Sequence, residues 1–454
     1  MSQAGVALLA SRFLGARRRG GRGRLIGAIV GVALSMVPLV VVQQVAEGMI
    51  GGIAERFIET GSYHLQAVAR DAPDPEAAAS VAARVERLSG VTGASVERRG
   101  FGLLYSDGGR RSGVSIRGVS TEWWREDPRV RELMDVSAGE FDLTEAEQIV
   151  VGAEIAARLE IGPGDSVRML TVRPVGEGRV LPRVSRFTVA GVVSSGYRDL
   201  DRLWAFVPLS RAQRIIPDET ATDLVGIKVD HPRALPNPLF NRGLTGLGRR
   251  EQSRDMLNTA EQVVSTFDAG WLVYDWYSAE RGRYVSFLTS RNLLAVVMAM
   301  IVLVAVVNIS SALVLLVVEK EQDIAILRAT GVSSRDVALT FVVAGFFIGV
   351  AGATLGAVVG LLAAININEI LRGIETVLSV FAGQSVDVFN PEFYLATIPV
   401  DLQFLPAAGA VFLVLALSVA AAIIPARRAA RIPPDRILRH GGGSPRALGR
   451  RRRA

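Results

Sequence analysis

The sequence predicts an α-helical membrane protein with four transmembrane helices and a large extracytoplasmic mixed α/β domain inserted between the first and second spans. Half of its 454 residues are apolar. Four apolar segments reach the length of about 20 residues that a helix needs to cross a hydrocarbon core of about 30 Å. Between the first two of them, residues 47–285 show the shorter, alternating patterns of a water-exposed domain.

The four spans are expected at 25–46, 286–318, 337–364 and 403–425, with apolar cores at Leu25–Ala46, Leu293–Val318, about Val337–Leu362 and Phe404–Ile424. The first could instead be a cleaved signal peptide. It is too long for one, however, and no small-residue cleavage site follows it, so we expect a retained anchor.

Arg residues orient the spans, because cytoplasmic flanks of membrane helices are enriched in Lys and Arg. Residues 1–24 hold six Arg and no acid, and the tail at 426–454 is equally basic. Both termini are therefore expected in the cytoplasm. The domain at 47–285 and the loop at 365–402 then face outward, and residues 319–336 return to the cytoplasm.

Composition excludes several classes of function. The formal charge of +7 comes from the two basic tails, which points to membrane lipids rather than nucleic acid. Only Lys228 and Lys320 are lysines, so no Walker A motif is present, and no Cys is available for thiol or metal chemistry. The three His lie far apart in sequence. We therefore predict no catalytic residues, no cofactor and no metal site.

Local patterns in the outer domain alternate between helix and strand. A helix should begin at Asp74-Pro75-Glu76, since Asp caps helices and Pro is favoured at the first position. Further helices are expected at Ala153–Leu159 and about Asp255–Ala269. Strands are expected at Val91–Val96, Gly102–Tyr105, Val114–Val119, Glu147–Gly152 and Arg186–Val193, and in SVRMLTV after the GPGD turn.

Glycines punctuate the third span at 345, 349, 352, 356 and 360. Small residues at four-residue spacing let helix backbones approach closely in a membrane. The pattern fits either packing within one bundle or a subunit interface. The aromatic residues Trp271, Tyr274, Trp276 and Tyr277 likewise fit either an interfacial belt or the core of the outer domain, whereas Trp123 and Trp124 favour core packing.

The cytoplasmic loop EKEQDIAILRATGVSSRDV, residues 319–337, carries the most specific pattern. Ile324 and Leu327, like Ala325 and Arg328, are three residues apart, which predicts a short amphipathic helix. Gly331 is placed to end that helix in a left-handed cap, and Ser333 with Asp336 forms a capping box for the third span. A mixed-charge helix between two spans suits force transfer to a soluble partner; the alternative is a solvated loop.

This segment resembles the coupling segment of FtsX-like permeases of type VII ABC transporters, and 286–425 matches their permease region. VVGAEIAARLEIGPGDSVRM in the outer domain and the ending NPEFY with PARRAARIPPDRILR resemble the lipoprotein-releasing (LolC/LolE-type) branch with its MacB-like periplasmic domain. The resemblance implies a permease subunit in a bacterial inner membrane that is not itself an enzyme. Its domain at 47–285 and its loop at 365–402 would then lie in the periplasm. A separate ABC ATPase would drive mechanotransmission, and lipoproteins would be released for transfer to the outer membrane.

The resemblance also implies partners and sites. The chain would pair with a second permease subunit, identical or different. The ATPase would contact Asp323, Ile324, Ala325, Ile326, Leu327, Arg328 and Gly331. The hairpin at 173–183, with Arg173, Pro174, Arg179, Pro182 and Arg183, occupies the place of a hook for a periplasmic carrier chaperone; otherwise it is an ordinary exposed hairpin.

Two alternatives keep the same architecture. The chain could be an FtsX-like regulator that activates a periplasmic cell-wall hydrolase, or a MacB-like efflux permease with a separate ATPase. The length of the outer domain favours lipoprotein export over the regulator. The absence of charged residues from the cores of the spans disfavours a proton- or ion-coupled carrier.

Overall fold

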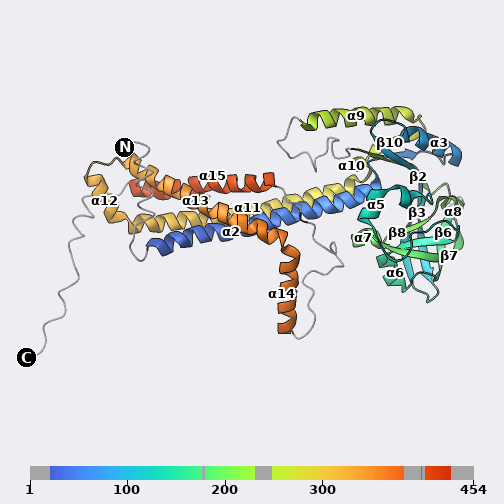
Figure 1. Ribbon diagram of the computed structural model, residues 1–454, viewed down its shortest axis with the longest axis horizontal. Helices are drawn as coiled ribbons and strands as arrows, with labels where there is room; N and C mark the ends of the chain where they lie inside the picture. Colours follow the sequence, from blue (N-terminus) through green and yellow to red (C-terminus); the bar gives the residue numbers. More distant parts are fainter. Residues whose placement is uncertain (1–20, 176–178, 231–247, 383–399, 401–403, 431–454) are drawn as a thin grey trace, which may run out of the picture. The chain divides into compact units, whose positions relative to one another are not determined.

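The computed structural model describes residues 21–175, 179–230, 248–382, 400 and 404–430, which divide into two compact units. One unit holds most of the apolar helices (residues up to 48, 291–376 and from 400), and the other holds residues 49–290 and 377–399. Figure 1 shows the elements in sequence colours.

The described part of the chain has four helices long and apolar enough to span a membrane. They are α2 (Gly21–Phe57), α11 (Arg281–Glu319), α13 (Ser334–Ile365) and α15 (Phe404–Ala430). The short helix α12 (Glu321–Ala329) connects α11 to α13, and α14 (Ile367–Ala382) follows α13. Both α2 and α11 continue beyond the predicted spans into the second unit. Helix α14 was not predicted.

The glycines of α13 pack within the bundle on two faces. A Cβ added at Gly345 or Gly349 would lie 2.7 to 2.8 Å from side chains of α15, and one added at Gly352 would lie 2.6 Å from Val32 of α2. Gly356 and Gly360 meet the same helix, at Met36 and Val40. Because only a hydrogen fits at these contacts, the pattern serves packing within this chain.

The second unit contains a ten-stranded mixed sheet in the order β10-β1-β9-β2-β3-β8-β5-β7-β4, with β6 joining β2 to β7. The strands are β1 (Leu65–Ala69), β2 (Val91–Ser106), β3 (Arg111–Val119), β4 (Asp135–Gly139), β5 (Gln148–Gly152), β6 (Ser166–Pro174), β7 (Val180–Ser194), β8 (Trp204–Pro208), β9 (Thr222–Val229) and β10 (Trp271–Asp275). The two strands predicted at Val91–Val96 and Gly102–Tyr105 are one long strand, β2.

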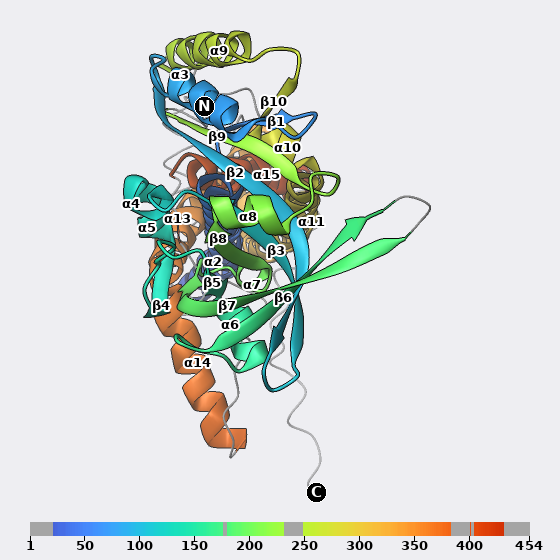
Figure 2. The same cartoon turned by 90° about the vertical axis from the view of Figure 1, so that its right-hand side faces the viewer.

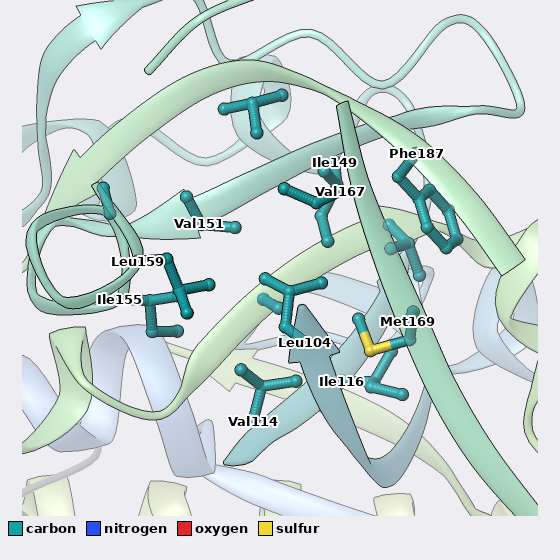
Figure 3. Packing of buried hydrophobic residues seen from close by; sticks show 14 of the residues in the cluster. Leu104, Val114, Ile116, Ile149, Val151, Ile155, Leu159, Val167, Met169 and Phe187 are labelled. Carbon is teal, nitrogen blue, oxygen red and sulfur yellow. The ribbon is translucent and has the colours of Figure 1, made fainter. Parts of the chain in front are cut away.

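Six of these strands close into a barrel, because β2 pairs with β3, β3 with β8, β8 with β5, β5 with β7, β7 with β6, and β6 with β2. Closure removes free sheet edges. Apolar side chains such as Leu104, Ile116, Met169 and Phe187 fill the interior (Figure 3).

Helices cover the rest of the sheet. They are α3 (Pro75–Glu86), α4 (Trp123–Glu126), α5 (Pro128–Leu133), α6 (Ala153–Leu159), α7 (Arg198–Asp201), α8 (Leu209–Ile215), α9 (Gly248–Thr266) and α10 (Trp276–Ala279). The predicted starts are confirmed at α3, where the Asp74 carboxylate accepts from the Glu76 N–H, and at α6. Trp123 and Trp276 are buried, so both belong to the core, whereas Tyr274 stays partly exposed.

Candidate functional site

Helix α12 forms as the sequence predicts. Gly331 ends it with φ of 95°, a left-handed conformation that favours glycine, and the Val332 N–H donates to the Leu327 carbonyl at 3.1 Å. Ser333 then caps α13, since its hydroxyl accepts from the Asp336 N–H at 3.1 Å. The two caps fix the turn between α12 and α13 within a few residues.

The apolar side chains of α12 divide into a buried and an exposed set. Ile324 and Ala325 are fully buried, whereas Ile326 is 52% exposed. The buried pair belongs to the bundle: Ile324 lies in one core cluster with Val317, Val337, Phe341, Ala426 and Ala429 of helices α11, α13 and α15. Helix α12 is therefore held against three spans by one face.

The other predicted coupling residues lie at or near the surface of this unit. Asp323 is exposed and pairs with Lys320 at 3.1 Å, Gly331 is exposed, and Leu327 and Arg328 are half-buried. A soluble partner can thus reach Asp323, Ile326 and Gly331 directly. Ile324 and Ala325 instead hold the helix in place.

The second predicted site is the hairpin of β6 and β7, which projects from the barrel (Figure 2). Its five predicted contact residues are all exposed, and residues 176–178 at its tip lie outside the described residues. Arg173 is 3.5 Å from Glu219, and the Arg183 guanidinium donates to the Arg214 carbonyl of α8. These two arginines therefore point to the α8 side of the hairpin.

Side chains alternate between the two faces of a strand, so the neighbours of these arginines point to the opposite face of the hairpin. The side chains on that face are mainly apolar, and several are exposed. Leu103, Leu170 and Val184 lie side by side across β2, β6 and β7. The face also carries Pro174 and Pro182, and Phe101, two residues before Leu103, is 81% exposed. A contiguous exposed apolar patch of this kind marks an interaction surface.

A third constellation, which sequence reasoning missed, fixes the outer end of α2. After Phe57 the chain forms a buried π-helical turn, η1 (Ile58–Ser62). Arg117 donates to the Thr60 carbonyl at 2.5 Å, and Arg99 donates to the Gly61 carbonyl at 2.6 Å.

Both arginines share one buried carboxylate. Glu97 accepts from Arg117 at 2.6 and 2.9 Å, from Arg99 at 2.8 and 3.1 Å, and from the Tyr63 hydroxyl at 2.8 Å. Burial would raise the pKa of Glu97, but the two guanidinium groups outweigh it and hold that pKa far below its usual range. Arg117 also lies 4.8 Å from the centre of the Trp204 ring.

A second buried carboxylate belongs to η1 itself. Glu59 lies 3.0 Å from Lys228 and 3.1 Å from His64 Nε2, and Lys228 also pairs with Asp127. Burial alone would raise the pKa of Glu59, yet His64 and Lys228 lower it to about 2. The Val229 N–H donates to His64 Nδ1 at 2.8 Å, so the ring is placed to donate from Nε2 to Glu59.

We call these residues the α2 anchor: Glu59, Tyr63, His64, Glu97, Arg99, Arg117, Asp127 and Lys228. They come from five separate stretches of sequence, so no local motif reveals them. One compositional signal existed, because Lys228 is one of only two lysines in the chain. Among the described residues, no group of three or more His, Cys, Asp or Glu side chains is placed to hold a metal ion.

Known families match both parts of the chain. A model of the FtsX-like permease C-terminal domain matches residues 295–434, and one of the MacB-like periplasmic core domain matches residues 25–236. The chain therefore contains an FtsX-like permease domain and a MacB-like periplasmic core domain. The MacB-like match covers strands β1 to β9, and the FtsX-like match covers most of α11 and all of α12 to α15.

Similar proteins cover nearly the whole of this permease. It is 29% identical over 446 residues to the lipoprotein-releasing system transmembrane protein LolC of Xylella fastidiosa strain Temecula1, covering 94% of this chain and 97% of that protein. The LolC protein of Neisseria meningitidis serogroup B is 28% identical, with 96% and 99% covered. A LolE protein of Haemophilus influenzae is 27% identical over 64% of each chain.

Among solved structures, the periplasmic region of MacB from Actinobacillus actinomycetemcomitans is 12% identical with a TM-score of 0.29, covering 50% of this chain and 95% of that one. The assignment of the periplasmic domain therefore depends on the family model rather than on this similarity.

Proposed function

We propose that this permease is the membrane subunit of an ABC transporter that releases lipoproteins from the inner membrane for transfer to the outer membrane. The observation that carries the proposal is the similarity to lipoprotein-releasing LolC proteins over 94 to 96% of the chain. A separate ATPase supplies the energy, since only two lysines are present and neither lies in a Walker A motif.

The coupling residues then have two separate roles. The exposed ones, on α12 and in the turn after it, bind the ATPase, and the buried ones hold α12 against the other helices. Asp323, Ile326 and Gly331 contact the ATPase, with Leu327 and Arg328 at the edge of the contact. Ile324 transfers the movement, because it packs α12 on α11, α13 and α15, and Ala325 is buried beside it. When the ATPase displaces α12, the helices α11, α13 and α15 therefore move with it.

The α2 anchor receives movement at the other end of the path. Helix α2 runs without interruption from Gly21 to Phe57, and its bundle half packs on the glycines of α13. Its outer end is bonded to β2 and β3 through Glu97, Arg99 and Arg117. The outer end of α2 then moves together with β2 and β3.

The hairpin of β6 and β7 provides the contact for a periplasmic carrier chaperone. A carrier of acylated proteins must itself bind lipid chains, so we expect it to have apolar surface. The exposed apolar face with Pro174, Pro182 and Val184 can pack against such a surface. Exchanging Val184 and Phe101 for Ser should weaken carrier binding at least about fivefold without changing the unfolding temperature, measured by surface plasmon resonance on detergent-solubilised permease. Unchanged affinity would assign the hairpin no role in that contact.

Reconstitution tests the proposed function. The permease is placed in liposomes with its ATPase, a second permease subunit and a triacylated lipoprotein, and a purified carrier is added outside. We expect ATP-dependent appearance of lipoprotein in the carrier fraction, and its loss in an Ile326→Asp variant. ATP hydrolysis without lipoprotein release, accompanied by activation of an added cell-wall hydrolase, would instead support the regulatory function.

The proposed topology places both termini in the cytoplasm, with 47–285 and 365–402 in the periplasm. The chain contains no Cys, so single Cys substitutions report accessibility without background. A Cys at Ser137, which is exposed in the outer domain, should react with an impermeant maleimide in intact spheroplasts, and one at Ser444 should react only after lysis. The reverse labelling pattern would invert the topology.

A further inference from the structure

The apolar side chains of helix α14, Ile367–Ala382, are exposed or half-buried. None of its side chains is buried, and Phe381 is 87% exposed. By contrast, α3 buries Ala78, Ala82 and Val85, and α12 buries Ile324 and Ala325. An exposed apolar side of this size indicates that a lipid or protein surface covers it.

The sequence of α14 separates polar from apolar residues almost completely. Seven large apolar residues recur three and four positions apart and share one side: Ile367, Ile370, Leu371, Ile374, Val377, Leu378 and Phe381. The opposite side carries Glu369, Arg372 and Thr376, with Glu369 and Arg372 paired at 2.8 Å. Val380 alone departs from this division.

The place of α14 in the chain identifies the occupant. Asn366 is the single residue between α14 and the span α13. Its side-chain amide donates to the Leu362 carbonyl at 2.8 Å, and its own carbonyl accepts from the Ile370 N–H at 2.9 Å. Asn366 therefore ends one helix and begins the next, so α14 starts where the hydrocarbon-spanning helix stops.

We infer that α14 lies in the lipid–water interface at the end of α13, with its apolar side inserted among the acyl chains and its polar side in water. Helices of this kind insert about 5–10 Å into the boundary between headgroups and acyl chains. With two Glu and one Arg, α14 has no basic surface to attract anionic lipids. Its contact with the bilayer therefore depends on apolar insertion and not on headgroup charge.

Anchoring α14 in this way would hold the outer end of the third span at a fixed depth while the cytoplasmic end moves with α12. The inference depends on the spans and not on the cargo, so the test below needs neither ATPase nor lipoprotein.

Two matched single-Cys variants of the full chain test the inference: Ile374→Cys on the apolar side and Thr376→Cys on the polar side. Each is labelled with a nitroxide and reconstituted in phosphatidylcholine liposomes, with or without phosphatidylglycerol. Power-saturation electron paramagnetic resonance then compares collisions with oxygen, which concentrates in lipid, and with a nickel chelate, which stays in water.

We expect the label at 374 to collide mainly with oxygen, and the label at 376 mainly with nickel, with oxygen-to-nickel ratios that differ at least about fivefold. Phosphatidylglycerol should change neither ratio by more than about twofold. High nickel accessibility at both positions would place α14 in water and overturn the inference. Protection of position 374 from both reagents would also overturn it, because protein, such as a second permease subunit, would then cover the apolar side.

Discussion

The coupling segment around α12 and the α2 anchor both hold a helix against its surroundings, but through opposite kinds of interaction. Helix α12 is held by small apolar contacts, with Ile324 against Phe341 and its neighbours, and by two local caps. The end of α2 is held by buried charges. Glu97 binds two arginines and the Tyr63 hydroxyl, and Glu59 binds Lys228 and His64. Apolar contacts tolerate small movements, whereas a buried carboxylate needs its partners in place. We therefore expect the contacts of α12 to adjust to small movements and those of the α2 anchor to stay rigid.

The largest effect is expected at the rigid end. Glu97→Ala leaves the Arg99 and Arg117 guanidinium groups without their shared carboxylate, and Arg117 is fully buried. Removing one partner of a buried ion pair costs about 3–5 kcal/mol, and the free energy of unfolding should fall by that amount. Denaturant unfolding of the purified permease in detergent, followed by tryptophan fluorescence, measures it.

Asp107→Ala is the matched control for this substitution. Asp107 lies 3.9 Å from Arg168, and both side chains are about half exposed or more. An exposed ion pair of this kind contributes less than about 1 kcal/mol. Similar losses for the two variants would show that the α2 anchor is not a buried charge network.

Acid should weaken the same anchor. Because the pKa of Glu59 falls from 4.5 to about 2 on folding, its ion pairs stabilise the fold fully above pH 4.5, and this stabilisation is lost as the pH falls toward 2. The stabilisation is on the order of 2–3 kcal/mol. The difference in unfolding free energy between the wild type and Glu59→Gln should therefore be largest near pH 6 and shrink steadily between pH 4.5 and 2. A difference that stays constant over this range would contradict the assigned ion pairs.

Within the bundle, packing is expected to be less sensitive than the anchor but still specific. Gly352→Val would force a side chain into the 2.6 Å gap to Val32, and overpacking of this kind costs about 1–3 kcal/mol. Gly409→Val on α15 is the control, since nothing lies within 4 Å of a Cβ there. Unfolding in mixed detergent micelles should separate the two variants, and equal stability would mean that α13 does not approach α2 closely.

Sequence patterns predicted the contiguous features of this fold and missed those that are assembled from distant segments. The four long apolar helices, the start of α3 at Asp74, the left-handed Gly331 and the Ser333 cap each depend on neighbouring residues, and the structure contains all of them. The α2 anchor joins Glu59 to Lys228, residues 169 positions apart, and pairing of this kind leaves no local pattern. Helix α14 was missed because its apolar stripe is too short for a span.

The same limit applies to the predicted coupling residues, which the structure divides into a buried and an exposed set. Sequence spacing showed that α12 is amphipathic, but one short helix gives no indication of which apolar residues face the bundle. The structure separates Ile324 from Ile326, two residues whose side chains look equivalent in the sequence.

The most direct test of the account compares these two isoleucines. Ile324→Asp and Ile326→Asp permeases are each co-expressed with the ATPase, purified through a tag on the permease, and examined for bound ATPase and for unfolding temperature. We predict that Ile326→Asp keeps the wild-type unfolding temperature and loses at least about tenfold in ATPase affinity, or about 1.4 kcal/mol. Ile324→Asp should unfold at a clearly lower temperature, because it buries a carboxylate among apolar side chains. Wild-type ATPase binding by a stably folded Ile326→Asp permease would contradict the claim that the exposed side of α12 is the coupling surface.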